Sequence, residues 1–217
     1  MKNNITELVF ILDRSGSMAG LESDTIGGFN ALVSKQKQQE GACYVTTVLF
    51  DHAHELLHDR VPLENLAPLT DRDYTVRGCT ALLDAIGDTI RHIARIHRYA
   101  RPEDVPAHTL FVITTDGMEN ASHKYTADEI RRRVEHEKEK YGWEFLFLGA
   151  NIDAIQTAKH YGIAPDRAVN YNADATGTAI AFDSVSEAVG NVRASVPLAA
   201  SWSCRISEDH STRKQER

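Results

Sequence analysis

The chain has 217 residues and a formal net charge of −7, with 42% hydrophobic and 25% charged residues. These values are typical of one globular domain with its own core, which we expect over residues 1–200. The acidic balance argues against general binding to nucleic acid. No apolar run approaches the roughly 20 residues that span a membrane, so we expect neither nucleic acid nor a membrane as a partner.

The cysteines and the first residues indicate a cytoplasmic protein. Cys43, Cys79 and Cys204 cannot all pair, and they lack the Cys-x-x-Cys spacing. Glu7 interrupts the start of the chain before any apolar stretch as long as that of a signal peptide. We therefore expect a reducing, cytoplasmic setting.

The first predicted strand is the apolar run 8–12, and it ends at Asp13. Asp13, Ser15 and Ser17 follow at alternate positions, so their oxygens can point at one place, and Gly16 lets the backbone bend between the hydroxyls. A set of ligands made only of oxygens suits a hard cation such as Mg²⁺.

A helix and a hairpin follow. Ile26, Phe29 and Val33 have helical spacing, 44–50 is a predicted strand, and a turn at Asp51 leads into a return strand over 54–58. This return strand would be antiparallel and lie at an edge of the sheet. The hairpin carries His52, His54 and His58. Their spacing is compatible with zinc, although histidines on an exposed edge are the simpler interpretation.

Thr80 stands at the start of a second predicted helix, whose apolar positions continue to Ile93. A threonine in this place is usually a helix N-cap. The same region carries a stripe of arginines on one side, for which an acidic partner is one interpretation and a solvated face the simpler one. The stripe consists of Arg91, Arg95, Arg98 and Arg101. A later basic run, 131–133, is interpreted as a solvated face because glutamates follow it.

A further strand over 109–115 ends at Asp116. The capping box Thr126-Ala-Asp-Glu129 then starts a helix. A strand over 143–148, a short helix over 154–161, an edge strand over 168–171 and a last helix through Val196 complete the pattern. The polar segment 201–217 is predicted to be a disordered tail.

This alternation predicts an α/β fold of three layers, doubly wound, with a mostly parallel central sheet of about six strands and one antiparallel edge strand. Ligands of such sheets gather at the carboxyl ends of the strands, where the topology reverses. Asp13 and Asp116 end strands that we expect to be central neighbours, so both would point into that crevice.

Three segments resemble the metal-ion-dependent adhesion site of von Willebrand factor A domains: Asp13-x-Ser15-x-Ser17, Thr80 within Gly-x-Thr-Ala-Leu, and Asp116 within Thr-Asp-Gly. The resemblance covers about residues 5–196 and implies a Rossmann-like fold. It also implies that Ser15, Ser17 and Thr80 contact a divalent ion, while Asp13 and Asp116 act mainly through waters. Mg²⁺ is the expected ion, with Ca²⁺ or Mn²⁺ as alternatives.

The resemblance further implies protein binding without catalysis, in which an Asp or Glu of another protein completes the coordination of the ion. Candidate rim residues for partner choice are Arg14, Met18, Arg77, Glu119, Asn120 and His123. Similar bacterial cytoplasmic proteins serve in tellurite-resistance and stress systems or beside ATPases, and the residues do not select among these settings.

The alternative is a metal-dependent hydrolase or phosphatase that uses the same residues. Phosphatases of the haloacid dehalogenase type need a second acid two positions after the first, where this chain has Ser15. A serine hydrolase would need a Gly-x-Ser-x-Gly elbow, which the sequence lacks. We therefore expect a protein that is not an enzyme.

Overall fold

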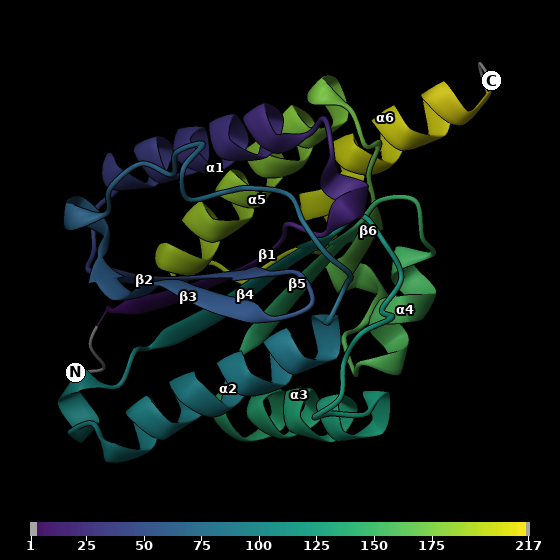
Figure 1. Ribbon diagram of the computed structural model, residues 1–217. Helices are drawn as coiled ribbons and strands as arrows, with labels where there is room; N and C mark the ends of the chain where they lie inside the picture. Colours follow the sequence, from purple (N-terminus) through teal and green to yellow (C-terminus); the bar gives the residue numbers. More distant parts are fainter. Residues whose placement is uncertain (1–3, 216–217) are drawn as a thin grey trace.

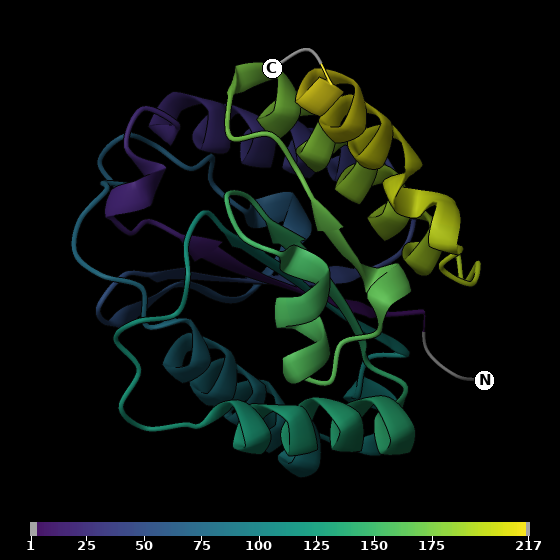
Figure 2. The same ribbon diagram turned by 90° about the vertical axis from the view of Figure 1, so that its right-hand side faces the viewer.

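The computed structural model describes residues 4–215, and these form a three-layer domain around one central sheet (Figures 1 and 2). The six strands have the order β3-β2-β1-β4-β5-β6. All neighbours are parallel except β2 and β3, so the antiparallel edge strand is β3. The strands are β1 (Thr6–Asp13), β2 (Cys43–Phe50), β3 (His54–Pro62), β4 (His108–Thr115), β5 (Glu144–Gly149) and β6 (Ala168–Asn170). The predicted fold class is confirmed.

Helices cover both faces of the sheet (Figure 1). One face carries α1 (Glu22–Lys37), α5 (Ala175–Arg193) and α6 (Cys204–Gln215), and the other carries α2 (Leu82–Tyr99), α3 (Ala127–Tyr141) and α4 (Ala154–His160). Alternate residues of a strand point to opposite faces of the sheet, so the strands contribute side chains to two hydrophobic cores, one on each face. In β1, Phe10 packs toward α1 and α5, whereas Ile11 packs toward α2.

Local sequence explains how several helices begin and pack. Thr126 and Glu129 form the predicted capping box at the start of α3. In α1, Gly28 lies directly beneath the Phe182 ring of α5, and a Cβ at this position would overlap that ring. The glycine therefore permits close approach of two helices.

The segment from Ser203 onward corrects the prediction of a disordered tail. Residues 204–215 form α6, while the last two residues of the predicted tail lie outside the described part of the chain. Trp202 and Ile206 are buried in the core beside α5. Arg213 pairs with Asp174 at 2.6 Å and with Asp209 at 2.5 Å. Two apolar anchors and these ion pairs suffice to fix a helix whose sequence is mostly polar.

The order of the strands places a topological switch between β1 and β4, because the chain moves outward from them in opposite directions. These two strands pair in register, with Leu12 opposite Thr114. Asp13 and Asp116 therefore lie at the carboxyl ends of neighbouring strands, as predicted. Within residues 4–215, we find no helix with both the length and the apolar character that a membrane crossing needs.

Candidate metal centre

Three loops meet at the carboxyl ends of β1 and β4, and backbone hydrogen bonds hold them together. The amide of Gly16 donates to the carbonyl of Gly78 at 3.1 Å, and the amide of Asn120 donates to the carbonyl of Thr80 at 3.0 Å. The loop that follows β1, called the β1 loop, and the loop that follows β4 are thus both hydrogen-bonded to the segment before α2. This brings the three sequence motifs to one place.

The Asp13 carboxylate organises the centre of this junction. It is fully buried, and one oxygen accepts from the Ser15 amide at 2.7 Å. The other oxygen accepts from Thr115 Oγ1 at 2.7 Å and from the Asp116 amide at 3.3 Å. Both oxygens are therefore oriented by neutral donors, and Asp13 links the β1 loop to the end of β4. Thr115 is a positioning residue that sequence reasoning missed.

The hydroxyls of Ser15, Ser17 and Thr80 converge beside Gly117. Ser15 Oγ and Ser17 Oγ lie 3.1 Å apart. A Cβ atom on Gly117 would lie 3.1 Å from Ser17 Oγ and 3.6 Å from Thr80 Oγ1, so the absence of a side chain keeps this space open. The three hydroxyls come from two separate loops and face the same small volume.

The interpretation of Thr80 as a helix N-cap is wrong. Helix α2 begins after Ala81, and no side chain at that position caps it. Instead, the first turn receives its acceptors from the loop after β4: Leu83 N donates to Glu119 Oε2 at 2.9 Å, and Asp84 N donates to Ser122 Oγ at 3.1 Å. The Thr80 hydroxyl therefore does not cap the helix. Thr80 is nevertheless buried, with 4% of its surface exposed.

Asp116 is the second buried carboxylate of the junction. Burial raises the pKa of Asp116 to about 6; the hydrogen bond from Asn151 opposes this rise, and the nearby Asp13 adds to it. Asn151 Nδ2 donates to Asp116 Oδ1 from the loop after β5. Asn151 has φ of 54°, a left-handed conformation that asparagine tolerates better than most residues. Sequence reasoning missed Asn151, whose one signal was its place just beyond a strand end.

Neither Asp13 nor Asp116 has a Lys, Arg or His nitrogen within 4.0 Å among residues 4–215. Two buried acids without a cation are costly, because burial disfavours their charged forms. The donors around them are hydroxyl and carboxylate oxygens, which are the preferred ligands of hard divalent cations. The residues therefore fit a bound ion of this class.

The structure corrects two of the predicted rim residues. Arg14 is only 3% exposed, because Nε pairs with Asp51 at 2.9 Å and Nη1 with Glu55 at 2.8 Å. Met18 is 2% exposed and belongs to the core beside α1. Neither side chain is available to a partner.

The other rim candidates remain near the junction. Arg77 is exposed but donates to Asp51 at 2.9 Å, and Asn120 Oδ1 accepts from the Thr80 amide at 2.9 Å. Glu119 is occupied in holding the start of α2, whereas His123 is exposed. Met118 was not among the predicted rim residues, although it directly follows the Asp116-Gly117 motif and is 76% exposed.

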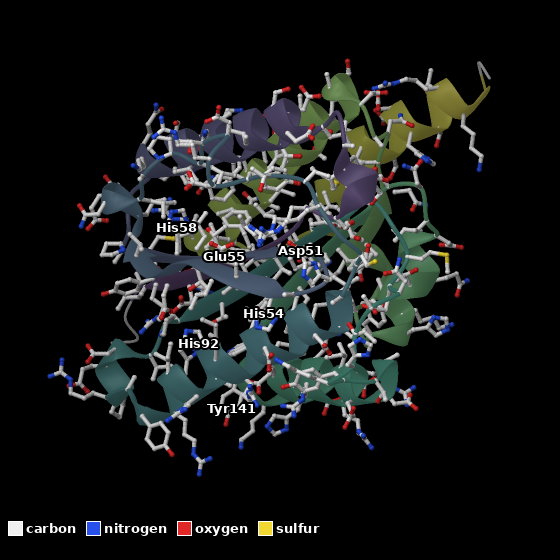
Figure 3. All side chains as sticks on the ribbon, in the orientation of Figure 1. Asp51, His54, Glu55, His58, His92 and Tyr141 are labelled. Carbon is white, nitrogen blue, oxygen red and sulfur yellow. The ribbon has the colours of Figure 1, made fainter. Side chains whose placement is uncertain are left out.

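The three histidines of the hairpin do not converge on one point. His54 approaches Asp88 of α2 at 3.4 Å, and His52 lies beside Asp51 at 2.8 Å. A β-bulge at Leu57 reverses the alternation of side chains, so His58 lies on the other side of the sheet from His54 (Figure 3). In the described part of the chain, no three His, Cys, Asp or Glu side chains are grouped to hold a metal.

Comparison with known proteins identifies the fold. The sequence matches no protein-family model and no curated protein. Solved structures do match: the von Willebrand factor domain of the type V pili tip protein Mfa5 from Porphyromonas gingivalis has a TM-score of 0.62 at 11% identity, over 89% of this chain and 97% of that one.

Two other neighbours are larger proteins. Proximal thread matrix protein 1 from the mussel byssus, with a zinc-occupied adhesion-site motif, gives a TM-score of 0.60 at 12% identity, over 88% of this chain and 47% of that one. A von Willebrand factor type A protein from Catenulispora acidiphila gives 0.58 at 13% identity, over 88% and 43%. The chain thus spans just under half the length of these proteins, and it has the fold of von Willebrand factor A domains.

Proposed function

We propose that this domain holds a divalent cation, Mg²⁺ in preference to Ca²⁺ or Mn²⁺, and binds an acidic residue of another protein through that ion. The residues that would hold it are Asp13, Ser15, Ser17, Thr80 and Asp116. The observation that carries the proposal is the pairing of two buried acids, without a cationic partner among the described residues, with three hydroxyls that face one volume. The zinc-occupied motif of the mussel protein supports a divalent ion at this place in the fold.

The donor set also favours a particular kind of partner. Because both Asp13 oxygens already accept hydrogen bonds from the protein, hydroxyls would supply most of the direct contacts. An ion with few carboxylate ligands keeps much of its positive charge and attracts a further anionic oxygen. The side chain of an Asp or Glu from a partner would provide it.

We further propose that the domain binds and does not catalyse. Among the described residues, the hydrogen-bonding partner of Ser15 Oγ is Ser17 Oγ, and neither hydroxyl is bonded to a histidine that would act as a base. The exposed cysteines Cys79 and Cys204 are free, which supports a reducing, cytoplasmic setting for this function.

Calorimetric titration with Mg²⁺ tests the ion site, and a pull-down with and without EDTA tests the partner. We expect Mg²⁺ binding that Asp13→Ala abolishes, while Asp128→Ala, which removes an exposed carboxylate on α3, leaves it unchanged. Proteins captured in Mg²⁺ should be released by EDTA and absent with Asp13→Ala. Identical Mg²⁺ binding by both variants would contradict the proposed site. Hydrolysis of phosphoesters or acyl esters that Ser15→Ala removes would favour an enzyme instead.

A further inference from the structure

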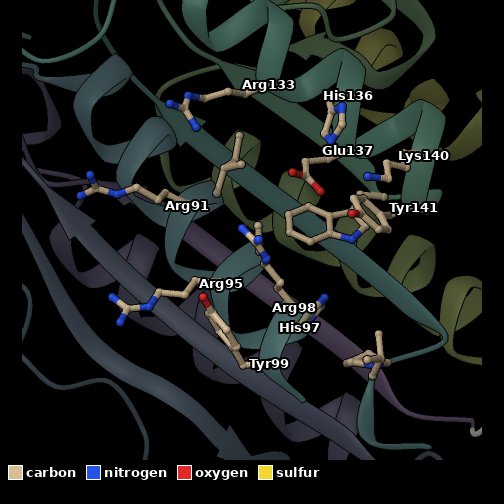
Figure 4. Close-up of a pocket in the computed structure, with 15 residues that line it drawn as sticks. Arg91, Arg95, His97, Arg98, Tyr99, Arg133, His136, Glu137, Lys140 and Tyr141 are labelled. Atoms are coloured by element: carbon tan, nitrogen blue, oxygen red, sulfur yellow. The ribbon is translucent and has the colours of Figure 1, made fainter. Parts of the chain in front are cut away.

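Away from the candidate metal centre, near the amino-terminal ends of β4 and β5, a groove opens between the later turns of α2 and α3 (Figure 4). We call it the α2–α3 groove. Its volume is about 880 Å³, within the range of small-molecule sites. Its floor is apolar and includes Ile90, Ala94 and Trp143. The Trp143 ring stacks on Phe111 of β4 at 5.3 Å between centroids, so the floor belongs to the rigid core.

The rim of the α2–α3 groove carries cations that form no close ion pair. Among the described residues, Arg95, Arg98, Arg133 and Lys140 have no carboxylate within 4.0 Å, whereas Arg91 pairs with Asp88 at 2.8 Å. This is unusual in a chain whose net charge is −7. Positive charge gathered around a hollow with apolar walls attracts anions.

Aromatic rings stand beside these cations. Tyr99 and Tyr141 are 76% and 55% exposed, and both line the groove. The Arg98 guanidinium lies 5.8 Å from the Tyr99 ring centre, and Lys140 Nζ lies 5.0 Å from that of Tyr141. Exposed rings next to guanidinium groups offer flat surfaces on which another ring can stack.

Glu137 adds an acceptor inside the basic groove. Its side chain extends from α3 into the space between the helices (Figure 4), and its residue is only 7% exposed. Oε2 has no hydrogen-bond partner among the described residues. Burial raises the pKa of Glu137, while the charges of His136, His97, Lys140 and Arg133 oppose this rise. A buried carboxylate oxygen without a donor is costly, and a ligand with an N–H group would satisfy it.

We propose that the α2–α3 groove binds a nucleotide, that is, a small ligand in which phosphate groups are joined to an aromatic base. Arg98 and Arg133 would hold the phosphates, because the planar guanidinium fork matches phosphate oxygens. The base would stack at Tyr99 or Tyr141 and donate an N–H to Glu137. An acidic peptide fits less well, since its carboxylates would approach the carboxylate of Glu137.

Calorimetric titration of the full chain with ATP and GTP tests this inference, with EDTA present so that no ion at Asp13 can hold the phosphates. We expect saturable binding of at least one nucleotide. Arg98→Gln combined with Arg133→Gln should weaken it at least about tenfold, because charge-assisted hydrogen bonds are lost. The matched control is Arg101→Gln combined with Arg131→Gln, which removes the same charge outside the groove and should keep the affinity within about twofold.

Inorganic triphosphate and a polyglutamate peptide separate the alternatives. Glu137→Gln should lower the ratio of nucleotide affinity to triphosphate affinity, because the amide is a weaker acceptor for the N–H of the base, whereas the loss of the carboxylate charge affects the phosphates of both ligands alike. The inference is overturned if neither nucleotide binds at millimolar concentration, or if the two double variants lose affinity equally. It is also overturned if triphosphate binds as tightly as the nucleotides, or if polyglutamate binds and the nucleotides do not. None of these results depends on the ion site, because Asp13 is not required for them.

Discussion

Arg14 and Asp51 form a buried ion pair that joins the β1 loop to the end of β2, with Arg14 Nε 2.9 Å from Asp51 Oδ2. The same oxygen accepts from Arg77 Nε at 2.9 Å. Burial opposes the charged form of Asp51, but the hydrogen bonds from Arg77, the Ala53 amide and Arg14 outweigh it and lower the pKa of Asp51. The residue next to the first candidate ligand is thus a structural anchor.

Removing this anchor should be costly. Within residues 4–215, Asp51→Ala leaves the buried Arg14 with the exposed Glu55 as its one acidic partner, so we expect the free energy of unfolding to fall by about 3 kcal/mol or more. Urea denaturation measures this change. Asp59→Ala, which removes a partly exposed partner of His92, should cost less than about 1 kcal/mol. Equal losses in the two variants would show that the buried pair has no special role.

Two threonines should separate stability from ion binding. Thr80→Ala removes a hydroxyl that no helix uses, so Mg²⁺ affinity should fall while stability changes little. Thr126→Ala breaks the capping box of α3 and should cost about 1 kcal/mol, with Mg²⁺ affinity unchanged. Thermal unfolding without metal and calorimetry with Mg²⁺ check both effects. The reverse pattern would contradict the role proposed for Thr80.

Asn151 should act on the ion through Asp116. Asn151→Gly keeps the left-handed backbone but loses the hydrogen bond to the Asp116 carboxylate. We expect weaker Mg²⁺ binding, because the carboxylate would no longer be held in one orientation. Asn172→Gly, which removes an amide bonded to Asp209 instead, is the control for calorimetry. Unchanged Mg²⁺ affinity in Asn151→Gly would rule out this positioning role.

His58 should make stability depend on pH. Burial lowers the pKa of His58, against the opposing charge of Asp73, and its Nδ1 has no hydrogen-bond partner among the described residues. In the unfolded chain, the pKa returns to about 6.5. As the pH falls, His58 of the unfolded state therefore binds a proton at a higher pH than His58 of the folded state. Stability falls as the pH drops below about 6.5. Unfolding midpoints between pH 8 and pH 5 should fall less steeply in His58→Gln than in the wild type, and an equal slope in both would contradict this role of His58.

The sequence predicted much of the fold because buried parallel strands appear as continuous apolar runs with helices between them. The order of motifs was enough to place Asp13 and Asp116 on neighbouring strands, and the register of β1 with β4 confirms this. The turn at Asp51 likewise predicted the antiparallel edge strand.

What the sequence did not predict depends on contacts between distant residues. A charged Arg14 beside the proposed ligands suggested a rim residue, because the two carboxylates that pair with it, Asp51 and Glu55, lie 37 and 41 positions away in the sequence. No local sequence pattern indicates the β-bulge that moves His58 to the other face of the sheet. The α2–α3 groove was equally hidden, since Arg98 and Arg133 each looked like part of a solvated face until the two helices were placed together.

Helix α6 affects how shortened forms of this protein would behave. Leu198, Trp202 and Ile206 cover apolar residues of α5, and Trp202 Nε1 also donates to the carbonyl of Asp166 at 2.8 Å. A chain cut where the obvious apolar pattern stops, near Val196, would leave that part of α5 open to water. Such a fragment would expose a hydrophobic patch on the face away from both proposed sites. Self-association through this patch could be mistaken for partner binding.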